Sequence, residues 1–310
     1  MAASPRSPTS QPSRRPAVAA SLIALAFAAA PLAGCVRDVT ASGTQHLEVA
    51  VAGDAPSVSV RVEMFNGPIE VRAGADGLVS AIVTTTGAGR SKEEAEADRA
   101  KVQVTLDANP DGSVLLRATY QPNPGSPNNR TASAVVEVPA GAALDLRTSN
   151  GNVSTAGIGG PIAVATSNGA VRLAEVAAGV TVRTSNKEVE IDGAGACDVE
   201  TSNAAIVLRG TDATVRADTS NATISFEGTL SAAAQKLETS NESVYLRLPA
   251  GSSFALDAQT SGGAEVVVRG FDVRTTGSAG EGTLQGAVGT GGPSITLRTS
   301  NRNIEVSALP

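Results

Sequence analysis

Three carboxylates recur at one place in the sequence, each directly before a copy of the tripeptide Thr-Ser-Asn: Glu200, Asp218 and Glu238. If these copies stack on one another, the carboxylates lie roughly 5 Å apart, where like charges repel and can share a hard cation such as Ca²⁺. However, Arg183 precedes them in the same series, and Arg216 and Lys236 stand two residues away on the same face. Surface ion pairing is therefore the favoured interpretation, and we predict no metal and no cofactor.

Residues for the usual catalytic chemistry are scarce. His46 is the sole histidine, so neither a Ser-His-Asp triad nor a histidine-rich zinc site can be assembled. A β-helix enzyme acting on polysaccharides needs exposed aromatic rings beside its acids, and aromatic residues make up only 2% of the chain. Phe226 and Phe254 are expected to face inward, which leaves Tyr245 and Tyr120. We predict a protein that is not an enzyme; the alternative is a β-helix enzyme acting on an envelope or extracellular polysaccharide.

The first 34 residues have the pattern of a targeting segment. Three arginines, at 6, 14 and 15, precede an uncharged apolar run over 17–30, which is too short to span a bilayer and is typical of a signal peptide. It leads to Leu32-Ala33-Gly34-Cys35, which resembles the lipobox of bacterial lipoproteins. The resemblance implies cleavage between Gly34 and Cys35, and acylation of Cys35 by palmitate or similar chains. The second cysteine, Cys197, then has no disulfide partner and is expected to be a small buried residue.

Charge argues against nucleic acid as a partner. Residues 1–34 contain three of the 24 basic residues and none of the 30 acidic ones, so the mature chain has a net charge of 21 − 30 = −9. A negative chain without a cluster of Lys and Arg does not attract phosphate backbones or anionic lipid. Contact with the membrane is therefore expected through the lipid on Cys35.

The tripeptide itself organises the chain. Thr-Ser-Asn occurs at 148–150, 166–168, 184–186, 201–203, 219–221, 239–241 and 299–301, with the variant Thr-Ser-Gly at 260–262. The first five copies are 18, 18, 17 and 18 residues apart, a period typical of stacked coils or hairpins. Apolar residues lie four and two places before the Thr, and five and seven places after it. This alternation predicts a short strand on each side of a Ser-Asn corner.

Two arrangements of such units are possible. Antiparallel hairpins would form a sandwich or barrel, but their two-residue turns prefer Asn-Gly, and Gly follows Asn only at corners 150 and 168. Successive coils of a parallel β-solenoid need one left-handed residue per corner, which Asn tolerates. We therefore predict an all-β fold, a parallel β-solenoid with two short strands per coil of about 18 residues. Its stacked corners would form a hydrogen-bonded ladder of Asn150, Asn168, Asn186, Asn203, Asn221, Asn241 and Asn301. The corner Thr is expected to point inward, with its hydroxyl bonded within the corner.

The rest of the chain is divided by local pattern. We expect a signal peptide over 1–34, a tether over 35–45, a β-rich N-terminal part over 46–131 and the repeat domain over 132–310. Ser91 and Glu94 form a capping box for one helix over 91–101. Phe65-Asn66-Gly67 looks like a degenerate first corner, and the Gly-rich stretch 270–292 is expected to be a loop or irregular coil before the last regular coil.

The repeats resemble a bacterial family of proposed adhesins built from β-strand repeats, a domain family of formally unknown function. The resemblance is carried by residues 136–141 leading into 144–151, by 246–251 before the Thr260 copy, and by 286–292 leading into 295–301. It covers the chain from about residue 46 onward. It implies a β-helix-like fold at the cell envelope, with roles in adhesion or envelope stress, and brings no catalytic residues.

These observations predict a lipid-anchored interaction protein of the bacterial cell envelope, facing the periplasm or exterior. Its partner would be an envelope protein or a surface glycan. Val36, which follows Cys35 and is not Asp, favours the outer membrane where one exists. The sequence leaves open the partner, the trigger, the leaflet, the oligomeric state and whether the three carboxylates bind a cation.

Overall fold

The computed structural model describes residues 39–51, 58–121 and 130–309. The chain divides into two compact units, 1–36 and 37–310, and every described residue belongs to the second. These residues form 24 strands and one short helix. The predicted all-β class with a β-solenoid-like repeat is confirmed. The described segments contain no helix that is long and apolar enough to cross a bilayer.

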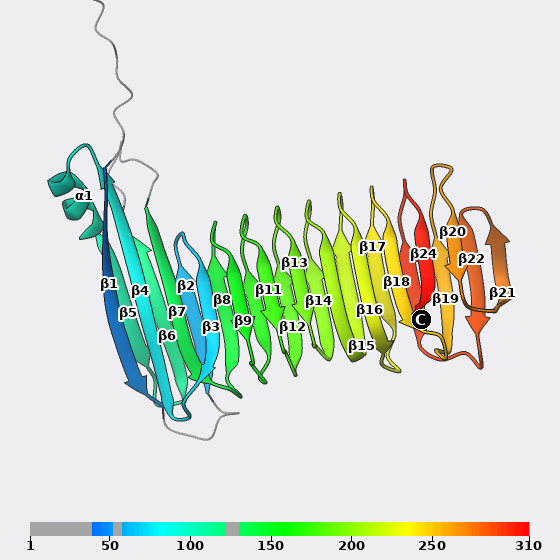
Figure 1. The fold of residues 1–310 in the computed structure, drawn as a ribbon, viewed down its shortest axis with the longest axis horizontal. Helices are drawn as coiled ribbons and strands as arrows, with labels where there is room; N and C mark the ends of the chain where they lie inside the picture. Colours follow the sequence, from blue (N-terminus) through cyan, green and yellow to red (C-terminus); the bar gives the residue numbers. More distant parts are fainter. Residues whose placement is uncertain (1–38, 52–57, 122–129, 310) are drawn as a thin grey trace, which may run out of the picture. The chain divides into compact units, whose positions relative to one another are not determined.

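The strands belong to two sheets that enclose the core between them (Figure 1). Sheet A contains, in order of pairing, β1 (Val39–Ala50), β4 (Leu78–Gly89), β7 (Thr131–Pro139), β3 (Ile69–Gly74), β9 (Val153–Ala156), β11 (Val171–Ala174), β13 (Val189–Asp192), the first part of β15 (Ile206–Thr219), β16 (Ile224–Leu230), β18 (Val244–Pro249), β24 (Ile304–Leu309) and β20 (Val266–Arg269).

Sheet B contains, again in order of pairing, β5 (Val102–Ala108), β6 (Ser113–Tyr120), β2 (Ser59–Met64), β8 (Ala143–Thr148), β10 (Ile162–Ala165), β12 (Gly179–Arg183), β14 (Ala196–Glu200), the second part of β15, β17 (Gln235–Thr239), β23 (Ser294–Arg298), β19 (Phe254–Gln259), β22 (Thr283–Val288) and β21 (Val273–Gly280). The strands from β6 to β19 pair in parallel, while β5, β22 and β21 at the two ends are antiparallel.

The parallel register places equivalent repeat positions side by side. Ile162 of β10, for example, pairs with Leu144 of β8 on one side and Val180 of β12 on the other. Because side chains alternate along a strand, the inward apolar positions of the stacked coils point into the space between the two sheets and are buried, while those at the ends of the stack, such as Val104 and Val268, are only partly buried. Phe226 and Phe254 are both 1% exposed, so their predicted inward position is confirmed.

An antiparallel cap covers the N-terminal end of the stack. β1 pairs with β4, β4 pairs with β7, and a hairpin turn over 109–112 joins β5 to β6. Helix α1 (Lys92–Arg99) packs against β4 and β1, and the Ser91 side chain caps it by accepting a hydrogen bond from the Glu94 amide at 3.3 Å. The helix thus lies within the predicted span 91–101, but only the Ser91 half of the predicted capping box is formed, because the Glu94 carboxylate accepts from the Arg90 amide at 2.8 Å instead of the Ser91 amide.

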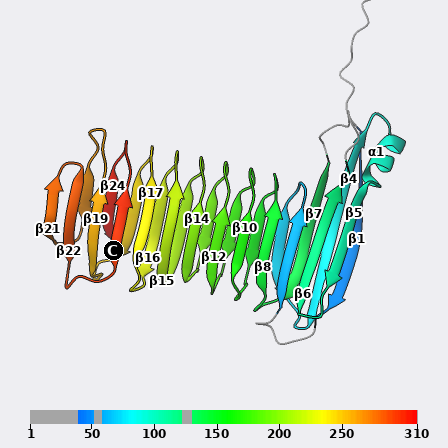
Figure 2. The same ribbon diagram turned by 180° about the vertical axis from the view of Figure 1, so that it is seen from behind.

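The order of coils in space differs from their order in the sequence at both ends. The coil of β2 and β3 lies between the pair β6–β7 and the pair β8–β9, so it is already part of the stack that we expected to begin at 132. At the other end, the last coil of β23 and β24 lies between β17–β18 and β19–β20, as Figure 2 shows from behind. Periodicity identifies coils but does not give their spatial order, which long-range pairing decides.

Two further expectations need correction. The tether predicted over 35–45 is too long, because residues from Val39 onward lie in β1, where they pair with β4. The sequence of this segment is polar because β1 is an edge strand whose side chains are mostly exposed. Such a strand lacks the apolar alternation from which a strand is predicted. The stretch 270–292 is not a loop: it contains β21 and β22, an antiparallel pair at the C-terminal end of sheet B.

A buried ion pair holds the helix to the cap. Asp98 and Arg130 are each 5% exposed, and Arg130 donates from Nη2 to Asp98 Oδ1 at 3.0 Å. Asp98 also accepts from the Tyr120 hydroxyl at 3.0 Å and from the Ala88 amide at 3.1 Å. Burial by itself would raise the pKa of Asp98, but these bonds and Lys101 outweigh it and hold the pKa well below the usual range. The cluster therefore stays ionised at neutral pH.

Replacing Asp98 by Ala is expected to lower the free energy of unfolding by about 3–5 kcal/mol, because it leaves the Arg130 charge buried without its carboxylate. Since the folded pKa of Asp98 is depressed, its contribution is present above the unfolded value of about 3.9 and is lost as pH falls further. Denaturant unfolding at pH 7 and pH 3 measures both effects. Glu96→Ala, on the exposed side of the same helix, is the control. Equal losses in the two variants would contradict the assignment.

Candidate functional site

The Thr-Ser-Asn corners of the repeat hold neighbouring coils together. Every corner Thr is buried, and in most corners its hydroxyl donates to a carbonyl of the adjacent coil, as Thr148 does to Gly67 at 2.8 Å and Thr239 to Ala222 at 2.9 Å. The expected inward Thr is therefore observed, but its bond joins two coils instead of closing one corner. The Thr184 and Thr201 hydroxyls find no partner among the described residues.

The seven corner asparagines form one continuous row. In each adjacent pair, Nδ2 of one Asn donates to Oδ1 of the Asn in the preceding coil, over 2.7–2.9 Å. The row runs from Asn150 to Asn301 and passes directly from Asn241 to Asn301, because the last coil is inserted there. The predicted left-handed Asn is wrong: outside glycine, the described residues with positive φ are Glu175 and Asp212. Asn is suited to the corner by its amide, which donates and accepts along the stack.

Glycine is required after two of these asparagines by close packing of the coils. A Cβ on Gly151 would lie 1.7 Å from the Gly67 carbonyl oxygen, and one on Gly169 would lie 1.7 Å from the Gly151 carbonyl oxygen. The Asn-Gly pairs at these corners therefore reflect contact between neighbouring coils and not a hairpin turn.

The outer face of sheet B carries the most organised polar surface. We call the outward residues of strands β6 to β23 that are aligned with the residue directly before each Thr-Ser-Asn corner the outer row; in spatial order they are Arg117, Glu63, Arg147, Ala165, Arg183, Glu200, Asp218, Glu238 and Arg298. Its first part is mainly basic and its second part mainly acidic. One strand spacing, about 4.8 Å, separates each member from the next.

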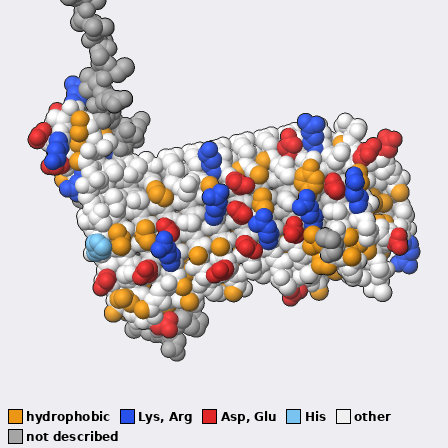
Figure 3. Space-filling view, in the orientation of Figure 1, with side chains coloured by type: hydrophobic (Ala, Val, Ile, Leu, Met, Phe, Trp, Pro, Cys, Tyr) orange, Lys and Arg blue, Asp and Glu red, His pale blue; other side chains and the backbone are white. Residues whose placement is uncertain are grey.

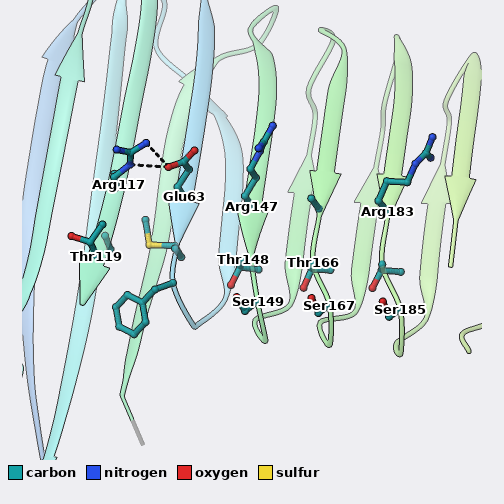
Figure 4. A pocket seen from close by; sticks show the side chains of 15 residues that line it. Glu63, Arg117, Thr119, Arg147, Thr148, Ser149, Thr166, Ser167, Arg183 and Ser185 are labelled. Atoms are coloured by element: carbon teal, nitrogen blue, oxygen red, sulfur yellow. Dashed lines mark hydrogen bonds and ion pairs between the residues drawn. The ribbon is translucent and has the colours of Figure 1, made fainter. Parts of the chain in front are cut away.

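The basic part of the outer row borders an open groove of about 550 Å³ (Figure 4). Arg147 and Arg183 project from β8 and β12, and the small side chain of Ala165 on β10 leaves a hollow between them. The corner residues Ser149, Ser167 and Ser185 line the lower edge in this view. The groove is thus lined by guanidinium groups, the Glu63 carboxylate, hydroxyl groups and apolar side chains such as Met64 and Phe65.

Acidic neighbours position these arginines. Arg147 makes a two-point contact with Asp145, over 2.9 Å and 3.0 Å, and this contact raises the pKa of Arg147. Arg183 binds Asp198 at 3.1 Å and Glu200 at 3.0 Å, while Arg117 binds Glu63 at 2.7 Å. The Arg147 and Arg183 side chains remain 51% and 40% exposed, so they are oriented and still accessible.

The three carboxylates do come together, as neighbours in the outer row. Glu200 pairs with Arg183 and Glu238 with Lys236 at 2.6 Å, but no cation lies within ion-pair distance of Asp218 among the described residues. Burial and the charges of Glu238 and Glu200 raise the pKa of Asp218, against the opposing effect of Lys236 and Arg216. Within 39–51, 58–121 and 130–309, no three His, Cys, Asp or Glu residues are arranged to hold a metal ion.

Other residues singled out from the sequence are dispersed. His46 lies exposed on edge strand β1, and Tyr245 lies on sheet A, away from the acids of sheet B. Tyr120 packs against Phe65, with ring centroids 5.8 Å apart. Cys197 is 5% exposed, as predicted, and burial raises the pKa of its thiol to about 12. Cys35 and the cleavage site before it fall outside the described residues.

Sheet A has a different outer face. Ion pairs such as Arg209–Glu190 at 3.1 Å and Arg247–Glu227 at 3.6 Å link successive coils. Basic and acidic side chains are interspersed over the face presented in Figure 3. On sheet A, opposite charges therefore alternate from coil to coil, whereas in the outer row of sheet B like charges are grouped.

The sequence contained part of the outer row. Arg183 was aligned with the three acids, and Arg147 and Ala165, which also stand one residue before the Thr, extend the same series and show the change of sign. Arg117 could not be aligned in this way, because β6 has no Thr-Ser-Asn corner and reaches the row only through its pairing with β2. Glu63 was signalled only by the degenerate corner at Asn66.

Comparison with known proteins gives a family match over most of the chain. A family model described as Toastrack DUF4097 matches residues 58–307. No curated protein matches the chain.

Three solved structures illustrate what the chain is similar to. One is a proposed cell adhesion protein from Clostridium sporogenes ATCC 15579, at 12% identity, with 86% of this chain and 100% of that chain covered and a TM-score of 0.28. The others come from Parabacteroides distasonis ATCC 8503: a proposed adhesin (10% identity, 85% and 97% covered, TM-score 0.33) and a proposed lipid-binding protein (11% identity, 86% and 97% covered, TM-score 0.36).

The asparagine row predicts a position-dependent loss of stability. Asn221→Ala removes a bond donated to Asn203 and one accepted from Asn241, so the free energy of unfolding should fall by about 1–3 kcal/mol. Asn150→Ala, at the end of the row, removes the single bond from Asn168 and should cost about half as much. Urea unfolding of the two variants beside the parent protein gives the comparison. The same loss at both positions would show that the row does not act through these bonds.

Proposed function

The chain belongs to the Toastrack DUF4097 family, and from that premise we propose that it is a lipid-anchored protein of the bacterial cell envelope whose β-repeat domain binds partners and catalyses no reaction. The observation that carries the proposal is that inward and outward positions of each coil differ in chemical character. Inward positions are aliphatic and buried, whereas outward positions are polar and are held in register by backbone pairing and the asparagine row. Such a surface is suited to contact rather than to enclosing a substrate.

The scaffold in this proposal is a parallel β-solenoid with two short strands per coil of about 18 residues, closed at its N-terminal end by the antiparallel cap. Binding would use outward residues of the two sheets and the corner edge. The partner would be an envelope protein or a surface glycan.

Attachment would be through acylated Cys35 after cleavage behind Gly34. Only residues 36–38 separate Cys35 from the start of β1, so the lipid would hold the domain within roughly 14 Å of its attachment point at full extension. Several acyl chains anchor a protein stably, since each buried methylene contributes about 0.8 kcal/mol. The location would be the periplasmic or exterior side, with the outer membrane favoured by Val36.

Anchoring predicts that Cys35→Ser abolishes incorporation of labelled palmitate and moves the protein from the membrane fraction to the soluble fraction. Cys197→Ala is the matched control, because that thiol is buried and should leave both labelling and membrane attachment unchanged. The measurement is metabolic labelling followed by fractionation of the cells. Label that persists in Cys35→Ser would exclude this anchor.

The binding role predicts that a photo-reactive residue placed at Ser225, on the outer face of sheet A, captures a defined envelope partner in intact cells. Mass spectrometry of the crosslinked species identifies it, and capture should fall in the unanchored Cys35→Ser variant. A panel of polysaccharides tests the enzymatic alternative on the same protein. Release of products that stops in Glu200→Gln would replace the binding role by catalysis.

A further inference from the structure

The charges of the outer row are complementary to the same row read backwards. Counting outward from the midpoint between Arg183 and Glu200, the residues at equal distances are Arg183 and Glu200, Ala165 and Asp218, Arg147 and Glu238, and Glu63 and Arg298. Wherever both members are charged, their signs are opposite. An arrangement of this kind is what a two-fold axis requires, because residue i then faces residue j while j faces i.

A second row on the same face obeys the same rule. It lies two residues before the outer row and contains, in spatial order, Arg61, Asp145, Ala163, Thr181, Asp198, Arg216, Lys236 and Thr296. Counted from the midpoint between Thr181 and Asp198, it matches Asp145 with Lys236 and places no like charges opposite each other. Both rows therefore share one midpoint along the stack.

We propose that the outer face of sheet B is the interface of a homodimer, formed about a two-fold axis that runs parallel to the strands through this midpoint. Such an axis reverses the order of the coils in the second copy and preserves the direction of its strands. The basic part of the outer row in one copy then faces the acidic part in the other. Arg183 meets Glu200, Arg147 meets Glu238 and Glu63 meets Arg298, each twice.

Shape agrees with charge at the centre of this face. The groove over Ala165 lies between Arg147 and Arg183, and the axis places Asp218 of the second copy opposite it. The Asp218 carboxylate, which lacks an ion pair within the described part of its own chain, would enter this hollow between two guanidinium groups. That burial with two cations would offset the repulsion that Glu200 and Glu238 exert on it.

The extent of the face suits a stable dimer. From the coil of Glu63 to that of Arg298, the outer row spans seven strand spacings, roughly 34 Å, and the strands are about 16 Å long, which gives a flat footprint of about 550 Å². Side-chain relief increases this area towards the roughly 800 Å² per partner of standard interfaces. Small outward residues such as Ala143, Ala163 and Gly179 allow the two sheets to approach.

The geometry is also compatible with anchoring. Because the axis preserves strand direction, β1 begins at the same edge in both copies, and two lipid anchors could reach one bilayer. The dimer does not require the lipid, so the two proposals stand or fall separately.

Charge exchange tests the interface. Variant one carries Arg147→Glu and Arg183→Glu, and variant two carries Glu200→Arg and Glu238→Arg. Mature full-length copies with two different affinity tags are co-expressed, solubilised in detergent and purified on one tag. Wild-type copies should co-purify. Each variant should pair with itself about tenfold less or worse, because like charges now face each other.

Variant one mixed with variant two should pair as the wild type does, since every exchanged charge then meets its opposite. A fold defect cannot produce this recovery. The control exchanges Glu190→Arg with Arg209→Glu on sheet A and should leave pairing unchanged. Wild-type copies that do not co-purify, variants that pair with themselves normally, or a mixture that stays apart would each overturn the proposal.

A second measurement tests the proposed contact between Ala165 and Asp218 and leaves the other charges of both rows unchanged. In a Cys197→Ala background, copies with Ala165→Cys mixed with copies with Asp218→Cys should form a disulfide-linked pair under mild oxidation. Ala163→Cys replaces Ala165→Cys in the control, because it lies in the other row. Crosslinking that is equal in both mixtures would contradict the proposed axis.

Discussion

Parallel backbone pairing between coils is the constraint on which the rest of this structure depends. A single coil has too few inward aliphatic side chains to offset the entropy of ordering its chain, so it is stable only with neighbours on both sides. Pairing at a fixed register then brings identical residues together from coil to coil. The buried aliphatic columns, the Thr hydroxyl bonds and the asparagine row all follow from that one alignment.

The same alignment explains how much could be predicted. A period near 18 residues and alternating polarity are local properties, so the fold class, the inward positions and the row of asparagines could be read directly from the sequence. The order of coils at the two ends could not, because β2–β3 and β23–β24 are placed by partners far away in the chain. The prediction of a left-handed backbone at the corner Asn is wrong, because Asn is suited to this position by the hydrogen bonds of its side-chain amide and not by a backbone preference. The outer row could be predicted in part: Arg183 and the three acids were aligned, but Arg147 and Ala165 were not.

The two outer faces show what the repeat leaves free to vary. Ion pairs between half-exposed side chains are worth little to stability, typically below about 1 kcal/mol each. The outward charges can therefore change with little effect on the stability of the fold. On sheet A opposite charges alternate from coil to coil, whereas the outer row of sheet B has a mainly basic part followed by a mainly acidic part.

The placement of the last coil has a consequence for how the protein is made. Residues 294–309 follow β17–β20 in the chain, yet they occupy a position between the coils of these strands. Until they arrive, β17 and β18 present open strand edges, and β19 and β20 have nothing parallel to join. This end of the stack therefore completes its parallel pairing only after β23 and β24 have been synthesised. A chain that stopped before residue 294 would leave these strand edges open, and open edges can pair with other chains.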